Sequence, residues 1–144
     1  MSKIIYTQPN GTVAVIHPVG GDATKAIKDV PDGVAYEIVE DSVIPTDRSF
    51  RSAWVQDNKT IKTDMSKAKD QHRKNIRRAR KFKFPDLDAE YNKLSETSAD
   101  TSAVVAKKQA LRDAPADSAI EAASDEAALK AQWNTGILGT SPYS

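Results

Sequence analysis

The sequence predicts an α+β fold, in which a small N-terminal antiparallel sheet is followed by an all-helical C-terminal region of about four helices. Runs of β-branched and aromatic residues, separated by turn-forming residues, fill residues 1–63. From residue 64 onward, apolar residues recur at spacings of three and four, as they do in amphipathic helices. We therefore divide the chain into an α+β head (1–63), a helical region (64–133) and an irregular C-terminal tail (134–144).

The first two strands are predicted around a hairpin turn. The β-rich runs Ile4–Thr7 and Thr12–Ile16 flank Gln8-Pro9-Asn10-Gly11, and Asn-Gly is a strong short-range hairpin signal. After His17-Pro18, apolar residues at helical spacing predict a short helix over residues 22–29. An isolated hairpin is marginal in water, so we expect a third strand to complete the sheet.

Residues 30–54 hold the clearest candidate for that third strand and both aromatic anchors of the head. Pro31-Asp32-Gly33 predicts a turn, and Tyr36–Glu40 then alternates as a half-buried strand does. A short helical turn over residues 47–53 would place Phe50 and Trp54 on one face, where they close a small core. The runs 54–56 and 60–62, joined by Asp57-Asn58-Lys59, predict a second, smaller hairpin.

A long basic helix is predicted from Asp64, its N-cap, to about Phe82, with Pro85 as its end. Asp86 would cap a separate helix whose acidic first turn faces the basic helix across a turn. The apolar stripe of the basic helix is narrow and buries one side only: Met65, Ala68, His72, Ile76, Ala79 and Phe82.

The region that follows is rich in alanine, with twelve alanines in the 33 residues from 99 to 131. We expect a helix over residues 102–113 with Pro115 after it, a helix opened by a Ser118/Glu121 capping box, and a short helix from Ser124. Alanine favours helix but contributes little burial, so a partner or a second copy of the chain is expected to supply the missing core. The candidate partner-binding anchors are Leu111, Ile120, Leu129 and Trp133.

Composition excludes several kinds of chemistry. Without cysteine there is no disulfide and no thiol catalysis, and the two histidines, His17 and His72, stand in no metal-ligand spacing. The carboxylate pairs at residues 40–41, 86/88 and 125–126 are better explained as caps and solvated surface than as an acid and a base. We expect no enzymatic activity, no cofactor and no metal. With no signal peptide and no long apolar run, we also expect a soluble, cytosolic protein.

The near-zero net charge of +1 conceals a strongly basic block. Residues 65–84 hold nine Lys or Arg and one acidic residue, whereas the segments on either side are acidic. The block could neutralise phosphates of a nucleic acid, or it could be a solvated face that pairs with acidic helices of the same chain or a partner. We favour the second interpretation, since no known DNA-binding motif accompanies the block. The candidate basic face is Arg73, Arg77, Arg78, Arg80 and Lys81.

Three segments resemble small proteins encoded among the tail and tail-fibre genes of tailed bacteriophages. These segments are KIIYTQPNGTVAVIHP, the block VPDGVAYEIVEDSVIPTDRSFRSAW and the helix DMSKAKDQHRKNIRRARK. In addition, KKQALRDAP (107–115) resembles the helix and proline stop of phage tail assembly chaperone proteins. The usual family pattern has larger apolar residues where this chain has Lys81-Phe82-Lys83-Phe84.

The resemblance implies a non-enzymatic tail accessory protein that binds a tail or tail-fibre protein. It would act in the host cytoplasm during assembly, as a chaperone, or remain in the virion as a structural component. Self-association would be a second source of burial, a nucleic-acid partner is disfavoured, and no membrane partner is expected. The alternative function is a nucleic-acid-binding phage accessory protein that uses the basic helix over residues 67–83.

Overall fold

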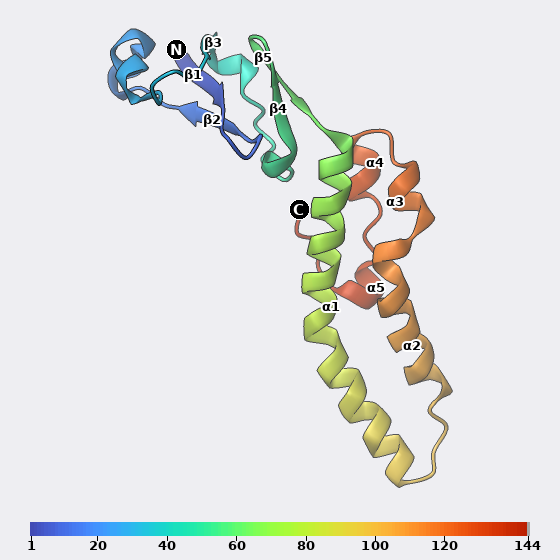
Figure 1. The fold of residues 1–144 in the computed structure, drawn as a ribbon. Coiled ribbons are helices and arrows are strands. Elements are labelled where there is room, and N and C mark those ends of the chain that lie inside the picture. The colour runs from blue at the N-terminus through green and yellow to red at the C-terminus, as the bar shows by residue number, and fades with distance from the viewer. Residues whose placement is uncertain (144) are drawn as a thin grey trace. The chain divides into compact units, whose positions relative to one another are not determined.

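A computed structural model describes residues 1–143 and confirms the α+β class, with strands first and helices after them (Figure 1). The chain forms two compact units, one of residues 1–68 and one from residue 69 onward. The first holds both sheets and the first turn of a long helix, and the second holds all the other α-helices.

The predicted hairpin and third strand form one antiparallel sheet in the order β2-β1-β3. Its strands are β1 (Ser2–Thr7), β2 (Val13–Ile16) and β3 (Tyr36–Glu40). In the β1–β2 turn, Gln8 N–H donates to the Thr12 carbonyl at 2.8 Å and Gly11 has φ of +83°, which a residue with a Cβ rarely adopts. Ile4 of β1 pairs with Ile16 of β2 and with Ile38 of β3, so β1 is the central strand.

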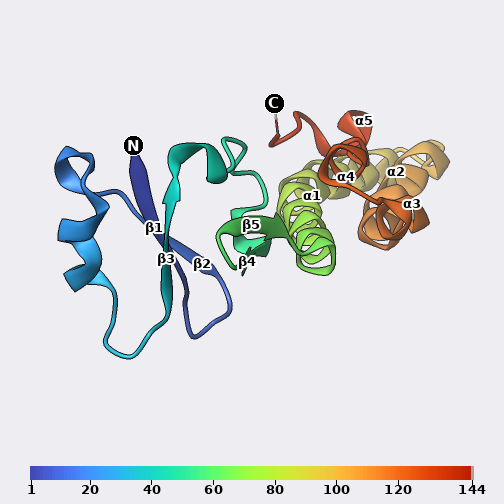
Figure 2. The ribbon, with the colours of Figure 1, turned by 90° about the horizontal axis from the view of Figure 1, so that it is seen from above.

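Both faces of this sheet are covered, whereas the sequence predicted a third strand buried on one side only. On one face, Ile4 packs with Ala23, Ala26 and Val30, in and just after the 3-10 helix η2 (Ala23–Asp29). On the other face, Ile5, Val13 and Val39 pack against Trp54: these residues form the second cluster of the unit. Figure 2 shows η2 and the second hairpin on opposite sides of the sheet. Side chains of β3 alternate between the two faces of the sheet, as predicted, and each face packs into a different core.

The two aromatic anchors of the head are buried as predicted, each with 1% of its surface exposed. The helical turn predicted over residues 47–53 is shorter than expected: Asp47 accepts the Ser49 N–H, and only η4 (Arg51–Ala53) is helical. Trp54 then opens the second hairpin, β4 (Trp54–Asp57) and β5 (Thr60–Thr63), in which Asn58 takes a positive φ of 52°. Two further 3-10 turns are η1 (Val19–Gly21) and η3 (Asp41–Val43).

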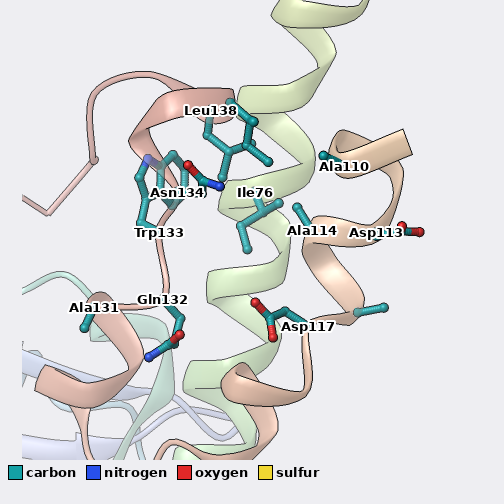
Figure 3. A pocket seen from close by; sticks show the side chains of 12 residues that line it. Ile76, Ala110, Asp113, Ala114, Asp117, Ala131, Gln132, Trp133, Asn134 and Leu138 are labelled. Carbon is teal, nitrogen blue, oxygen red and sulfur yellow. The ribbon is translucent and has the colours of Figure 1, made fainter. Parts of the chain in front are cut away.

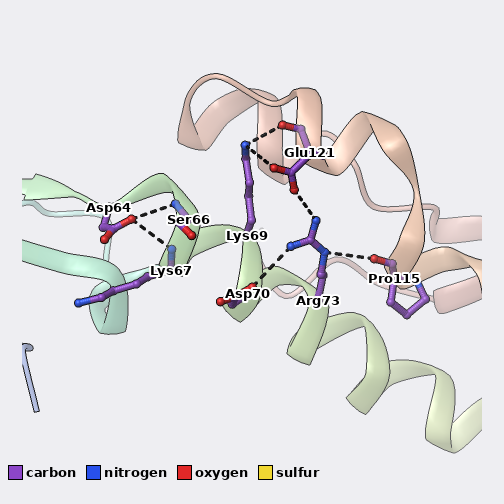
Figure 4. Close-up of polar contacts among 8 residues, drawn as sticks. All are labelled: Asp64, Ser66, Lys67, Lys69, Asp70, Arg73, Pro115 and Glu121. Atoms are coloured by element: carbon purple, nitrogen blue, oxygen red, sulfur yellow. Dashed lines mark hydrogen bonds and ion pairs between the residues drawn. The ribbon is translucent and has the colours of Figure 1, made fainter.

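The long helix α1 runs without interruption from Met65 to Glu96, so the prediction that Pro85 ends it was wrong. Its start is as predicted, because Asp64 accepts the N–H groups of Ser66 and Lys67 at 3.0 and 3.3 Å (Figure 4). Pro85 is exposed, so water can solvate the carbonyl four residues earlier that loses its hydrogen bond. Since no turn separates the basic and acidic segments, the predicted hairpin of complementary charge does not form.

Four shorter α-helices follow within the described residues 97–143. They are α2 (Ser102–Asp113), which has the predicted bounds, α3 (Ser118–Ala122), α4 (Glu126–Lys130) and α5 (Thr135–Leu138). The 3-10 turn η5 (Ala114–Ala116) contains Pro115 and ends α2. The caps of α3 and α4 are Asp117 and Asp125, one residue from the serines that were predicted. Helix α5 also lies in the tail that was expected to be irregular.

We predict that Trp54→Ala destabilises the sheet-containing unit by about 3–5 kcal/mol, because the ring fills the core beside β1 and its removal leaves a cavity. The measurement is urea unfolding followed by amide NMR signals of residues in β1. Val19→Ala is the control, since Val19 is 98% exposed and its loss should change the free energy of unfolding by less than about 0.5 kcal/mol. A loss below about 1 kcal/mol for the tryptophan variant would contradict the packing described.

Candidate functional site

Three of the four predicted partner anchors belong to the core of the helical unit. Leu111, Ile120 and Leu129 have 1%, 1% and 0% of their surface exposed, although no partner is present. The chain itself therefore supplies the burial that was assigned to a partner, and α1 contributes the buried His72 and Ile76 to this unit. Trp133 is half-buried. A partner could contact the first three anchors only after this unit had opened, so that assignment is corrected.

His72 lies at the centre of a hydrogen-bond network that joins α1 to the end of the chain. Its ring is fully buried, with Nε2 2.9 Å from the Gln132 carbonyl oxygen and Nδ1 2.5 Å from the Tyr143 hydroxyl. Tyr143 stacks on the imidazole at a centroid distance of 5.6 Å, and Trp133 approaches both rings edge-on at 6.1 Å. The C-terminal segment is thus fixed to α1 by polar contacts as well as by aromatic packing.

The chemistry of the partners shows which atom donates and which accepts in each hydrogen bond of this network. A carbonyl only accepts, so Nε2–H donates to Gln132, and a neutral imidazole must then accept at Nδ1 from the Tyr143 hydroxyl. The tyrosine oxygen in turn accepts from Asn75 Nδ2 at 3.1 Å, and Asn75 Oδ1 accepts from Gln71 at 2.9 Å. Every member is satisfied with His72 in its neutral form, in agreement with the absence of unpaired buried side-chain N or O atoms within residues 1–143.

Burial shifts the pKa of His72 and the pKa of Tyr143 in the directions that favour their neutral forms. It lowers the pKa of His72 below 6.5; the bond to the Gln132 carbonyl opposes this shift, and the positive charge of Arg73 adds to it. Burial likewise raises the pKa of Tyr143 above 10.0, opposed by the hydrogen bond from Asn75. The arrangement therefore favours the neutral forms of both side chains.

One side of the basic helix binds the C-terminal helices (Figure 4). The Arg73 guanidinium donates to the Glu121 carboxylate at 2.8 Å and to the Pro115 carbonyl at 3.3 Å. The ammonium of Lys69 donates to the Glu121 carbonyl at 2.6 Å. The hydrogen bond from Arg73 and then the charge of Lys69 lower the pKa of the Glu121 carboxyl. Arg80 similarly donates to the carbonyls of Leu111 and Arg112, at the end of α2.

The opposite side of the basic helix is exposed. Four residues form this basic row, with spacings that place them on one broad face of the helix: Lys74, Arg77, Arg78 and Lys81. None of them makes an ion pair with any residue in the part of the chain that the structure describes. The candidate basic face predicted from sequence is therefore divided, with Arg73 and Arg80 held by intramolecular contacts and the other three members in solvent.

The far part of the helical unit lacks a core of its own. No residue from 77 to 103, a segment we call the distal arm, is buried, and Phe82 in it is 72% exposed. The predicted apolar stripe of α1 thus ends at Ile76, with Ala79 half-buried. Besides those of Arg80, the contacts of the arm to α2 include an ion pair between Lys108 and Asp88 at 2.6 Å and the approach of the same ammonium to the Tyr91 ring.

A cavity of about 570 Å³ opens within the helical unit (Figure 3). Its walls come from α1, the end of α2 with η5, and the segment from residue 131 to α5. Polar and apolar atoms contribute about equally to the lining, and the apolar part includes Ile76, Trp133 and Leu138. Asp113 and Asp117 are the charged members of the lining; in Figure 3 the Asp117 carboxylate points into the hollow and that of Asp113 points away.

The carboxylate pairs considered from sequence have structural partners. Asp41 pairs with Lys3 at 3.1 Å, Asp88 with Lys108, and Asp125 caps α4. Within residues 1–143, no three His, Asp or Glu side chains lie together as a metal site would require. In the same range, no helix is long and apolar enough to cross a membrane.

Sequence reasoning placed His72 on the apolar stripe but missed its network, and it missed the Arg73–Glu121 pair. The partners lie 48 to 71 residues away along the chain, and no local pattern relates them. No protein family, curated protein or solved structure gives a significant match to the chain.

We predict that the helical unit loses stability as the pH falls through 6.5. With its pKa lowered in the fold, His72 stays neutral there while the unfolded chain takes up a proton, so acid favours unfolding. The free energy of unfolding should be constant above this range and decline below it, down to the lowered pKa. Urea titrations at several pH values, followed by the Trp133 indole N–H signal, measure this dependence.

His72→Gln should remove this part of the pH dependence. The matched control is His17→Gln, because His17 is the other histidine of the chain and is exposed in the sheet-containing unit. A wild-type curve that is flat between pH 7 and pH 5 would show that His72 is not held neutral by the fold.

Proposed function

We propose that this chain is a non-enzymatic accessory protein of a bacteriophage tail, which binds a tail or tail-fibre protein through the distal arm. The observation that carries the proposal is the absence of any buried residue from 77 to 103, in a helical segment that exposes Phe82. Isolated helices are marginal in water, and exposed apolar side chains on them are a common means of helix docking. The resemblance of the sequence to tail-associated phage proteins suggests the class of partner.

This location replaces the one predicted from sequence. Leu111, Ile120 and Leu129 complete the bundle, so the binding surface is moved along the molecule to the part of α1 and the loop to α2 that the bundle leaves exposed. The buried part of the helical unit would then hold rigid the segment of α1 from which the distal arm extends. Mass spectrometry of purified particles would distinguish a chaperone, absent from the virion, from a retained tail component.

For this function we predict that Phe82→Ala weakens binding to the cognate tail or tail-fibre protein by roughly ten-fold or more, since buried aromatic side chains dominate interface energies. Binding is measured by isothermal titration calorimetry with the purified partner. The variant should unfold like the native chain, because Phe82 is 72% exposed. Val19→Ala, which alters an exposed residue of the other unit, is the control. Unchanged affinity in the Phe82 variant would contradict binding through the arm.

The exposed basic row favours a second candidate function, the binding of a nucleic acid. Lys74, Arg77, Arg78 and Lys81 present four positive charges on one face of a single helix, without carboxylates paired to them in the described chain. Such a face would bind phosphates in a salt-dependent manner. Arg73 and Arg80 cannot contribute fully, because their guanidinium groups contact Glu121 and backbone carbonyls.

If this second function holds, changing Arg77 and Arg78 to Gln should lower affinity for duplex DNA and reduce the slope of log K against log salt by about two. Electrophoretic shift assays over a range of salt concentrations measure both quantities. The matched control is the double change of Lys25 and Lys28 to Gln, which removes the same charge from the sheet-containing unit. No shift of any DNA by the native chain at low salt would exclude this candidate.

A further inference from the structure

The cavity beside Trp133 has the size of a ligand site. Its volume of about 570 Å³ lies within the range in which proteins bind small molecules. All of its walls belong to the helical unit, and they join segments that are far apart in the sequence: α1, the end of α2, and residues 131–138. The site therefore exists only when that unit is folded.

Two of the side chains in the wall that carry polar groups, Trp133 and Asn134, already make hydrogen bonds within the chain. The indole Nε1 of Trp133 donates to the Gly139 carbonyl at 3.0 Å, so the ring presents an apolar aromatic surface to the cavity. Asn134 is engaged as the cap of α5, where it accepts the Gly136 N–H at 3.0 Å. A ligand would thus meet polar atoms as well as apolar side chains, among the latter Ile76 and Leu138.

Asp117, an exposed residue, provides a negative charge on this wall of mixed polarity. Its Oδ1 accepts the Ala119 N–H at 2.9 Å as the cap of α3, which leaves Oδ2 for a further donor. The carboxylate points into the hollow, with Ile76 between it and Trp133 (Figure 3). None of the twelve lining residues is basic, and Asp117 makes no ion pair with the part of the chain that the structure describes. Nearby Arg73 is paired with a different carboxylate, that of Glu121.

We propose that this cavity binds an organic cation, an ammonium or guanidinium group carried on an apolar stem. The Asp117 carboxylate would form a charge-assisted hydrogen bond with the cationic group, and the stem would lie on Trp133 and Ile76. The ligand is either a free amine or the basic side chain of a protein. This inference is independent of the proposed function, because the cavity and the distal arm are different surfaces.

The test is titration of the ¹⁵N-labelled full chain with 2-phenylethylamine, compared with its neutral analogue 2-phenylethanol. The indole N–H signal of Trp133 should shift and saturate with the amine, while that of Trp54, buried in the other unit, stays fixed as an internal reference. The alcohol should bind roughly ten-fold more weakly or not at all. Equal binding of the alcohol, or no saturable shift with the amine at millimolar concentrations, would overturn the proposal.

Asp117→Asn removes the charge and keeps the cap, since asparagine caps helices about as well as aspartate. We expect it to weaken binding of the amine roughly ten-fold, whereas Asp125→Asn, the same change at the cap of α4 outside the cavity, leaves binding unchanged. Equal affinity in both variants would also overturn the proposal. If Asp117→Asn failed to fold, the comparison of amine with alcohol on the native chain would remain decisive.

A third probe, N-acetylarginine methylamide, distinguishes the two sources of the ligand. Tighter binding of this probe than of 2-phenylethylamine would indicate that the cavity receives a basic side chain of a protein partner. Tighter binding of the amine would indicate a free small molecule. Both results depend on recognition of a cation and support the proposal.

Discussion

A buried imidazole needs a hydrogen-bond partner at each nitrogen, and His72 obtains both from residues 132–143. This requirement organises the helical unit. Gln132 must place its carbonyl and Tyr143 its hydroxyl on the same side of α1, and Trp133 is then positioned edge-on to both rings. The C-terminal segment is consequently part of the bundle, and its short helices gain from α1 the burial that their alanine-rich sequence lacks.

The basic character of α1 has two separate roles in the structure. Lys69, Arg73 and Arg80 turn their donors toward Glu121 and toward backbone carbonyls near the ends of α2 and η5, where such groups have few partners within the helix. These contacts are charge-assisted and add to the apolar packing of α1 against the helices that follow it. The basic row on the other side is exposed and makes no ion pair with residues 1–143, so its positive charge faces solvent.

The helical unit therefore divides into parts with different physical properties. Around His72 and Ile76 it is closed and has a core, and the cavity beside Trp133 lies where the alanine-rich segments are too small to fill the space. Beyond Ile76, the distal arm has helical propensity but little burial. An interaction surface is expected where a helix is formed without a core, and the arm meets that description better than the buried anchors Leu111, Ile120 and Leu129 that were predicted from sequence.

Local chemistry was sufficient for much of the fold. The Asn-Gly turn, the Asp64 cap and the bounds of α2 follow from interactions within a few residues, which a sequence displays directly. The tertiary structure decided the rest. Pro85 is accommodated in α1 because it faces solvent, β3 serves two cores because η2 and β4 cover opposite faces, and Leu111, Ile120 and Leu129 are internal because α1 covers them. Each outcome depends on contacts between residues tens of positions apart, and the energy of such a contact is set by spatial arrangement, which composition and periodicity do not encode.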